Sequence, residues 1–242
     1  MSTSAADSDA LRPLTMDDLD WVLDLSGARR ERIAAFAPQF WRPAPDARQR
    51  HATFLSGQVA DERVLSLQTD HGFMFAVPRG DAMDIDDMAL DDETRWSGDG
   101  RRLLRAAAGV GALRLVCPVP EPERTQAAVD LGMSVEEVWW HRDLAPSAQP
   151  RPVLDRVLAV EGGAGHLVDP PPVYAPGGPV ALTREVASAE ALGAIEKLAA
   201  TRGATVSVVS QRPDDRARAE LLQMTGYKRT TDFYFLRPAA GT

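Results

Sequence analysis

Apolar residues near the start of the chain recur at the spacing of amphipathic helices. After a short strand expected over residues 11–14, Thr15 and Asp18 have the spacing of a capping box, which predicts a helix start. Two further helices are expected over residues 28–36 and 46–60.

Beyond residue 60 the pattern changes from helical to alternating. Residues 64–69 and 73–77 flank the turn Asp70-His71-Gly72, so they predict a β-hairpin. A third strand is expected over residues 82–90, and a helix that ends near residue 108 follows it.

The later part of the chain contains one order of elements twice. Strand, helix, glycine and strand are expected over residues 113–144, where Gly132 ends the helix, and again over residues 205–236, where Gly226 does so. We interpret this as a degenerate internal duplication; two unrelated α/β segments are the alternative. A strand over residues 180–186 and a helix precede the second copy.

These patterns divide the chain into two expected domains. Residues 1–10 are small, polar and acidic and predict a flexible tail. Residues 11–144 form the first domain, the proline-containing segment 145–152 is a linker, and residues 153–242 form a second, shortened domain.

Composition narrows the class of protein. The chain has 242 residues, of which 44% are hydrophobic and 26% charged, and its formal net charge is −8. Neither a basic nucleic-acid surface nor an apolar run near the ~20 residues of a membrane span is present in the sequence. The single cysteine excludes an internal disulfide framework, and we expect a cytoplasmic protein.

The candidate chemistry begins directly after the strand over residues 82–90. The segment Arg95-Trp96-Ser97-Gly98-Asp99-Gly100-Arg101-Arg102 joins this strand to the following helix. Two close glycines at a helix start expose backbone N–H groups, and the positive end of the helix dipole attracts an anion to them. The alternative is a glycine-rich turn that only connects strand and helix.

The order of elements and the pattern Arg95-x-x-Gly98-x-Gly100 together resemble the GNAT superfamily of N-acetyltransferases. The resemblance covers residues 11–144, and over residues 180–236 it covers only the later elements. It implies an α+β fold with a mixed sheet, built as a tandem of one complete and one shortened GNAT-like half.

The resemblance also implies acetyl-coenzyme A, or another acyl-coenzyme A, as co-substrate, with no metal. The N–H groups of residues 96–101 would hold its pyrophosphate, and Arg101 or Arg102 would add a charged contact. Backbone groups near Met88 and Leu90 would bind the pantetheine arm. Asp99 departs from this scheme, because an acid in an anion-binding loop is tolerable only where it faces solvent.

The resemblance places a catalytic base eleven residues before Arg95. This position is Asp84, with Asp86 as second choice, and strict alternation would put both on one strand face with Met88 and Leu90. Seven carboxylates within residues 81–93 are equally typical of an exposed edge or an ion-pair network. The tyrosine that serves as acid in the family is replaced by Ala128 in the first half and by Leu222 in the second.

The leading interpretation is an acyltransferase that moves an acetyl or other acyl group to a primary amine, carried by a small molecule or a peptide. A non-catalytic coenzyme A-binding or protein-interaction module is the alternative, and a GNAT-shaped protein without a cofactor is a third. We expect neither nucleic acid nor membrane as partner, and a monomer or a homodimer.

Overall fold

A computed structural model describes residues 10–145 and 156–237, and the side chain of Asp86 is not among those described. Contacts divide the chain into two compact units. Unit 1 comprises residues 1–29, 48–135 and 233–242, and unit 2 comprises residues 30–47 and 136–232. The expected tail and nearly all of the expected linker lie outside the described residues.

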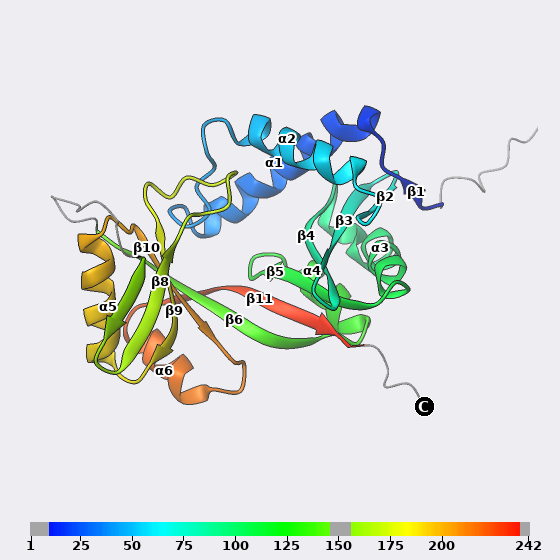
Figure 1. Ribbon diagram of the computed structural model, residues 1–242. Helices are drawn as coiled ribbons and strands as arrows, with labels where there is room; N and C mark the ends of the chain where they lie inside the picture. Colours follow the sequence, from blue (N-terminus) through cyan, green and yellow to red (C-terminus); the bar gives the residue numbers. More distant parts are fainter. Residues whose placement is uncertain (1–9, 146–155, 238–242) are drawn as a thin grey trace, which may run out of the picture. The chain divides into compact units, whose positions relative to one another are not determined.

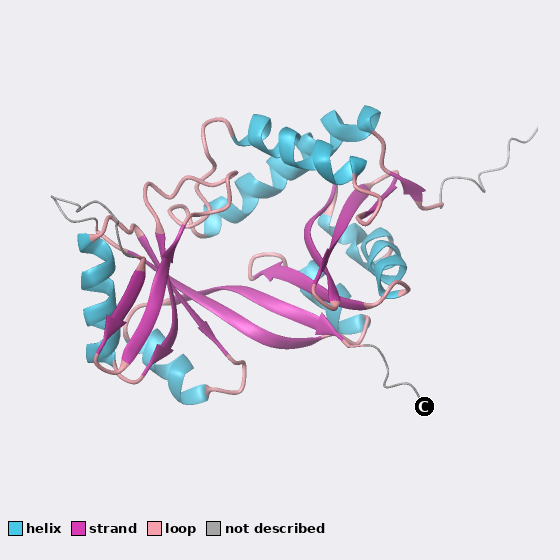
Figure 2. Ribbon diagram, viewed as in Figure 1, coloured by secondary structure: helices cyan, strands magenta, loops and turns pink. Residues whose placement is uncertain are grey.

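Unit 1 is built on a mixed sheet with helices on both faces (Figures 1 and 2). Its strands follow the order β1-β2-β3-β4-β5-β11, and only β4 and β5 are described as a parallel pair there. The strands are β1 (Arg12–Pro13), β2 (Leu65–Thr69), β3 (Gly72–Arg79), β4 (Ala82–Leu90), β5 (Ala112–Pro118) and β11 (Lys228–Leu236), of which residues 233–236 belong to unit 1 and residues 228–232 to unit 2. The helices are η1 (Met16–Asp18), α1 (Leu19–Phe36), α2 (Ala47–Ala60), η2 (Glu93–Ser97), α3 (Asp99–Ala108) and α4 (Pro122–Asp130).

The capping box at the first helix is confirmed, and one helix boundary is corrected. The Asp18 carboxylate accepts hydrogen bonds from the backbone N–H and the hydroxyl of Thr15, at 2.8 and 2.7 Å. α1 then continues through residues 28–36, where a separate helix was expected. Ser26 and Gly27 weaken helix propensity, but burial of Val22 and Ile33 on either side of them outweighs this cost.

A β-bulge in β4 overturns the expectation that alternation continues along the whole strand. Ala76 of β3 pairs with Ile85, but Met74, two residues away, pairs with Met88, three residues away. One extra residue on one strand reverses the side to which side chains point. Ile85 and Met88 therefore face the same apolar core, with α3 and α4.

Unit 2 contains a hairpin that the sequence patterns did not reveal. Its strands follow the order β11-β6-β10-β9-β8-β7, and β9 and β10 are parallel. The strands not yet given are β6 (Ser134–Asp143), β7 (Val157–Val160), β8 (Gly163–Val168), β9 (Val180–Val186) and β10 (Val206–Gln211); the helices are α5 (Ala189–Thr201) and α6 (Arg216–Met224). β7 and β8 are the unexpected pair, because the small residues of β8 carry no apolar alternation. α5 packs along this hairpin (Figure 1).

The order strand–helix–glycine–strand occurs in both parts of the chain, as expected. Gly132 follows α4 with a φ of +84°, and Gly226 follows α6 with a φ of +82°. The strand after each glycine pairs in an unexpected way: β6 pairs antiparallel with β10 in unit 2, and the end of β11 contributes Tyr234 to the core of unit 1. Within the described residues, no helix is both long and apolar enough to cross a membrane.

Candidate functional site

The segment between β4 and α3 is more tightly wound than an open glycine loop. η2 ends at Ser97, the Gly98 N–H donates to the Arg95 carbonyl at 3.0 Å, and α3 starts one residue later. The first intrahelical bond runs from the Arg102 N–H to the Gly98 carbonyl, at 3.1 Å. The N–H groups of the three preceding residues therefore have no acceptor within the helix.

The two glycines have different structural roles. A Cβ added at Gly98 would come no closer than 3.8 Å to another atom, the Arg95 carbonyl oxygen, so this side of the backbone is open. A Cβ at Gly100 would lie 2.4 Å from Cε3 of Trp96. Trp96 is buried and donates from its indole to Glu93 at 2.9 Å. Gly100 thus allows the helix to pack on Trp96, and Gly98 is the position where a ligand can approach.

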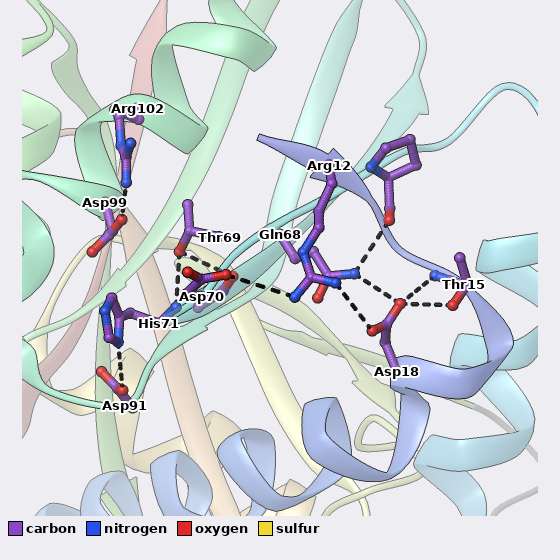
Figure 3. Close-up of polar contacts among 12 residues, drawn as sticks. Arg12, Thr15, Asp18, Gln68, Thr69, Asp70, His71, Asp91, Asp99 and Arg102 are labelled. Atoms are coloured by element: carbon purple, nitrogen blue, oxygen red, sulfur yellow. Dashed lines mark hydrogen bonds and ion pairs between the residues drawn. The ribbon is translucent and has the colours of Figure 1, made fainter. Parts of the chain in front are cut away.

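Asp99 does not face solvent. Its side chain, in the first turn of α3, is only 8% exposed and forms an ion pair with Arg102 (Figure 3). An Arg95 guanidinium nitrogen lies 3.9 Å from the other Asp99 oxygen. The carboxylate already compensates the positive helix end.

The remaining charges around the loop are also paired. Arg95 contacts Asp91 at 3.2 Å, and Asp91 contacts the Nδ1 atom of His71 at 3.0 Å (Figure 3). Arg101 pairs with Asp130 at 2.9 Å. Each arginine predicted to contact pyrophosphate therefore has a carboxylate partner, which the sequence pattern did not show.

The backbone near the end of β4 accepts a hydrogen bond from a buried arginine of α4, which sequence reasoning missed. β4 and β5 pair only as far as Ile85 and Leu115, and beyond that point Arg124 of α4 donates to the Met88 carbonyl at 2.8 Å. The Arg124 side chain is fully buried and lies 5.2 Å from the Trp96 ring centroid. Its guanidinium is thus hydrogen-bonded to the Met88 carbonyl, a backbone group near which the resemblance places the pantetheine arm.

One buried acidic group, Glu121, holds two arginines together. Glu121, at the N-cap of α4, lies 3.9 Å from Arg124 and accepts two hydrogen bonds from Arg29, at 2.7 and 2.9 Å. The spacing of Glu121 and Arg124 by three residues at a helix start was the available sequence signal. The neighbouring Cys117 is buried in the core, and burial raises the pKa of its thiol to about 11.

Asp84, the first of the predicted bases, lies on the face of β4 opposite to Leu90. Because Met83 and Ile85 on either side of Asp84 join the core that also contains Leu90, Asp84 points to the opposite face, and the expected shared face is wrong. Asp84 is 13% exposed and contacts Arg79 and Arg114 at 3.3 and 3.2 Å. Asp86 lies in β4 at the bulge.

Most described carboxylates of the segment 81–93 have structural partners. Besides Asp84 and Asp91, Asp87 contacts the Nε2 atom of the buried His51 at 3.0 Å, and Asp92 caps η2 by accepting from the Thr94 N–H. This arrangement corresponds to the ion-pair network considered as the alternative. Ala128 and Leu222, which stand where the resemblance would place a tyrosine as general acid, are both buried.

Unit 2 contains a counterpart of the arginine at the end of β4. Arg218 of α6 donates to the Arg184 carbonyl in β9 at 3.0 Å and contacts the N-cap residue Asp215 at 3.3 Å. An open surface depression of about 690 Å³ adjoins Arg218. It is lined further by Ala159, Val160, Gly162, Gly163, Ala164, Glu185, Val186 and Ala187.

Comparison with known proteins identifies the fold. No family model and no curated protein matches the sequence. A GCN5-related N-acetyltransferase from Sphaerobacter thermophilus has a similar structure, with a TM-score of 0.61, 11% identity and 99% coverage of both chains. A candidate acetyltransferase from Thermoplasma acidophilum gives a TM-score of 0.57 at 11% identity, with 95% of this chain and all of the other covered.

A third structure extends the similarity. A candidate acetyltransferase from Pyrococcus horikoshii has a TM-score of 0.54 at 12% identity, covering 99% of this chain and 92% of that one. In all three cases the aligned region includes nearly the whole chain, and therefore residues of both units. The protein has the mixed α/β fold of the GNAT acetyltransferases.

Proposed function

We propose that the protein is an acyl-coenzyme A-dependent N-acyltransferase whose cofactor binds to unit 1. The observation that carries this proposal is the N-terminus of α3, where the N-cap residue Gly98 makes no side-chain cap and a Cβ added at Gly98 would meet only the Arg95 carbonyl oxygen, at 3.8 Å. The N–H groups of Asp99, Gly100 and Arg101 would hold the diphosphate, and the guanidinium groups of Arg95, in η2, and Arg102, in α3, both contact Asp99 at this helix end. When bound, the thioester supplies an activated acyl group.

The proposed reaction also requires a residue that removes a proton from the amine acceptor. An amine acceptor must lose a proton, and Asp84 and Asp86 stay the proposed bases. The guanidinium groups of Arg79 and Arg114 contact the Asp84 carboxylate and restrict its access. The proposed acceptor is a primary amine on a small molecule or a peptide, and the proposed setting is the cytoplasm, as a monomer or homodimer.

The second candidate is a non-catalytic coenzyme A-binding module of GNAT shape. The position of Asp84 on the face opposite to Leu90, together with Ala128 at the acid position, favours it. The shortened second half, with no glycine-rich segment before α5, belongs to either candidate.

Two measurements separate the candidates. Acetyl-coenzyme A should raise the thermal midpoint of unfolding in proportion to the logarithm of its concentration above Kd. Release of free coenzyme A with a panel of amines should then be followed for the wild type and Asp84→Asn. Binding with turnover supports the transferase, and binding without turnover supports the module. No stabilisation at millimolar acetyl-coenzyme A contradicts both.

A further inference from the structure

The N-terminus of α3 already contains an anion that belongs to the protein. We propose that Asp99 is a resident counter-ion that competes with an incoming diphosphate, so that Asp99 sets the affinity of the site for its ligand. The proposal rests on the proposed function, since it concerns the same helix end. It adds a residue that opposes binding, where the sequence pattern indicated only residues that promote it.

Geometry places Asp99 in direct competition. Its carboxylate lies in the first turn of α3, beside the N–H groups that would hold the diphosphate. It contacts two cations, Arg102 of α3 and Arg95 of the preceding η2. At 8% exposure, Asp99 cannot exchange these partners for water without a local change.

The charges of this cluster cancel. His71, Asp91, Arg95, Asp99 and Arg102 form a continuous series of contacts in which acids and bases alternate (Figure 3 draws its two ends). Its two carboxylates, Asp91 and Asp99, balance its two guanidinium groups, Arg95 and Arg102. An incoming diphosphate therefore meets a neutral cluster, and binding requires that Arg102 and Arg95 exchange Asp99 for a phosphate oxygen.

Replacing the carboxylate by an amide of the same shape removes the competitor. In Asp99→Asn the cluster gains one net positive charge, and Arg102 becomes available to a ligand. The substitution keeps the size of the side chain, which limits disturbance of the packing around Gly100 and Trp96.

The experiment compares two probes by calorimetric titration. Coenzyme A carries the diphosphate, and pantetheine lacks it. We expect Asp99→Asn to bind coenzyme A about tenfold more tightly than the wild type, with no change for pantetheine. Asp214→Asn is the matched control: it removes an equal charge and an equal contact, with Arg212, from an exposed pair in unit 2. We expect it to bind both probes as the wild type does.

The outcomes distinguish this inference from the proposed function. If coenzyme A binds the wild type and Asp99→Asn binds it no more tightly, the counter-ion role is wrong and the proposed function stands. If neither protein binds coenzyme A, the proposed function fails. Tighter binding of pantetheine as well would also contradict the role, because the gain would not depend on phosphate. Should Asp99→Asn not fold, Asp99→Ser gives the same test, since serine is well tolerated at a helix start.

Discussion

Each unit contains a hydrogen bond from a helix arginine to a strand carbonyl, and the two arginines differ in burial. In each, an arginine in the first turn of a helix donates to a carbonyl two residues before the end of the preceding bulged strand: Arg124 to Met88, and Arg218 to Arg184. Both arginines lie eight residues before the glycine that follows their helix, and an acidic residue, Glu121 or Asp215, occupies the N-cap position of each helix. This correspondence supports the proposed internal duplication.

The surroundings of the two arginines differ. Arg124 is fully buried against Trp96 and beside Glu121, whereas Arg218 is 24% exposed and adjoins an open surface depression. In unit 1 the hydrogen bond from Arg124 to the Met88 carbonyl lies in the buried interior. In unit 2 the corresponding arginine is partly exposed. If the charge of Arg218 is removed, its partner Asp215, which is 37% exposed, still has access to water. The sequence of unit 1 resembles a cofactor site more closely than that of unit 2 does, and the arginine in unit 1 is also the more deeply buried of the two.

The largest expected effect tests this contrast in burial. Arg124→Met should lower the free energy of unfolding by about 3–5 kcal/mol, because it removes a buried hydrogen bond to Met88 and leaves a void under Trp96. Arg218→Met should cost less than about 1 kcal/mol, as expected for an exposed pair. Urea unfolding measures both. Equal losses would show that the two positions do not differ in burial.

The single cysteine provides a second measurement on the same pair of variants. Cys117 is buried, and the high pKa of its thiol suppresses the reactive thiolate. Arg124 lowers the pKa of this thiol against the larger effect of burial, so Arg124→Met should slow Cys117 alkylation in the folded protein, whereas Arg218→Met should leave the rate unchanged.

Sequence patterns predicted much of the architecture but few of the contacts that distinguish the units. β4 and β9 were predicted with their observed bounds, because apolar runs bounded by turn residues specify a strand locally. The bulge in β4 and the hairpin of β7 and β8 were missed, since both depend on pairing with a neighbouring strand. The partners of Arg124 and Asp99 come from other elements or from helix packing, and spacing alone did not assign them.

The two glycines of the loop allow a finer comparison within unit 1. Gly100→Ala should cost about 1–3 kcal/mol, because the new methyl group would overlap the Trp96 ring. Gly98→Ala has no close neighbour and a φ of −109°, so its effect on stability should be small. It should instead weaken coenzyme A binding, as seen by titration. A stable Gly100→Ala protein would contradict the packing role of Trp96.

Asp84 tests the face of β4 that lies opposite to Leu90. Asp84→Asn removes a largely buried partner of Arg79 and Arg114, and we expect a loss of about 1–2 kcal/mol in unfolding experiments. Coenzyme A affinity should not change, because this side chain points away from the core that contains Leu90. A tenfold or greater loss of turnover at unchanged affinity would instead support the role of base. Arg79→Gln is the control, since it weakens the ion pair without removing the carboxylate.

The smallest expected effect concerns a buried histidine of unit 2. His141 stacks on Phe40 at 5.3 Å, and burial lowers the pKa of its imidazole, against the opposing effect of Asp143 and together with that of Lys228. Because the folded protein binds a proton less readily than the unfolded chain, stability should fall as pH decreases below about 6.5. One such group changes the free energy of unfolding by at most about 1.4 kcal/mol per pH unit.

His141→Phe keeps a ring on Phe40 and removes the titration, so unfolding curves between pH 7 and pH 5 should show a shallower loss than in the wild type. An unchanged pH profile would mean that His141 takes up its proton equally well in both states, and the buried stack would then not account for any acid sensitivity of unit 2.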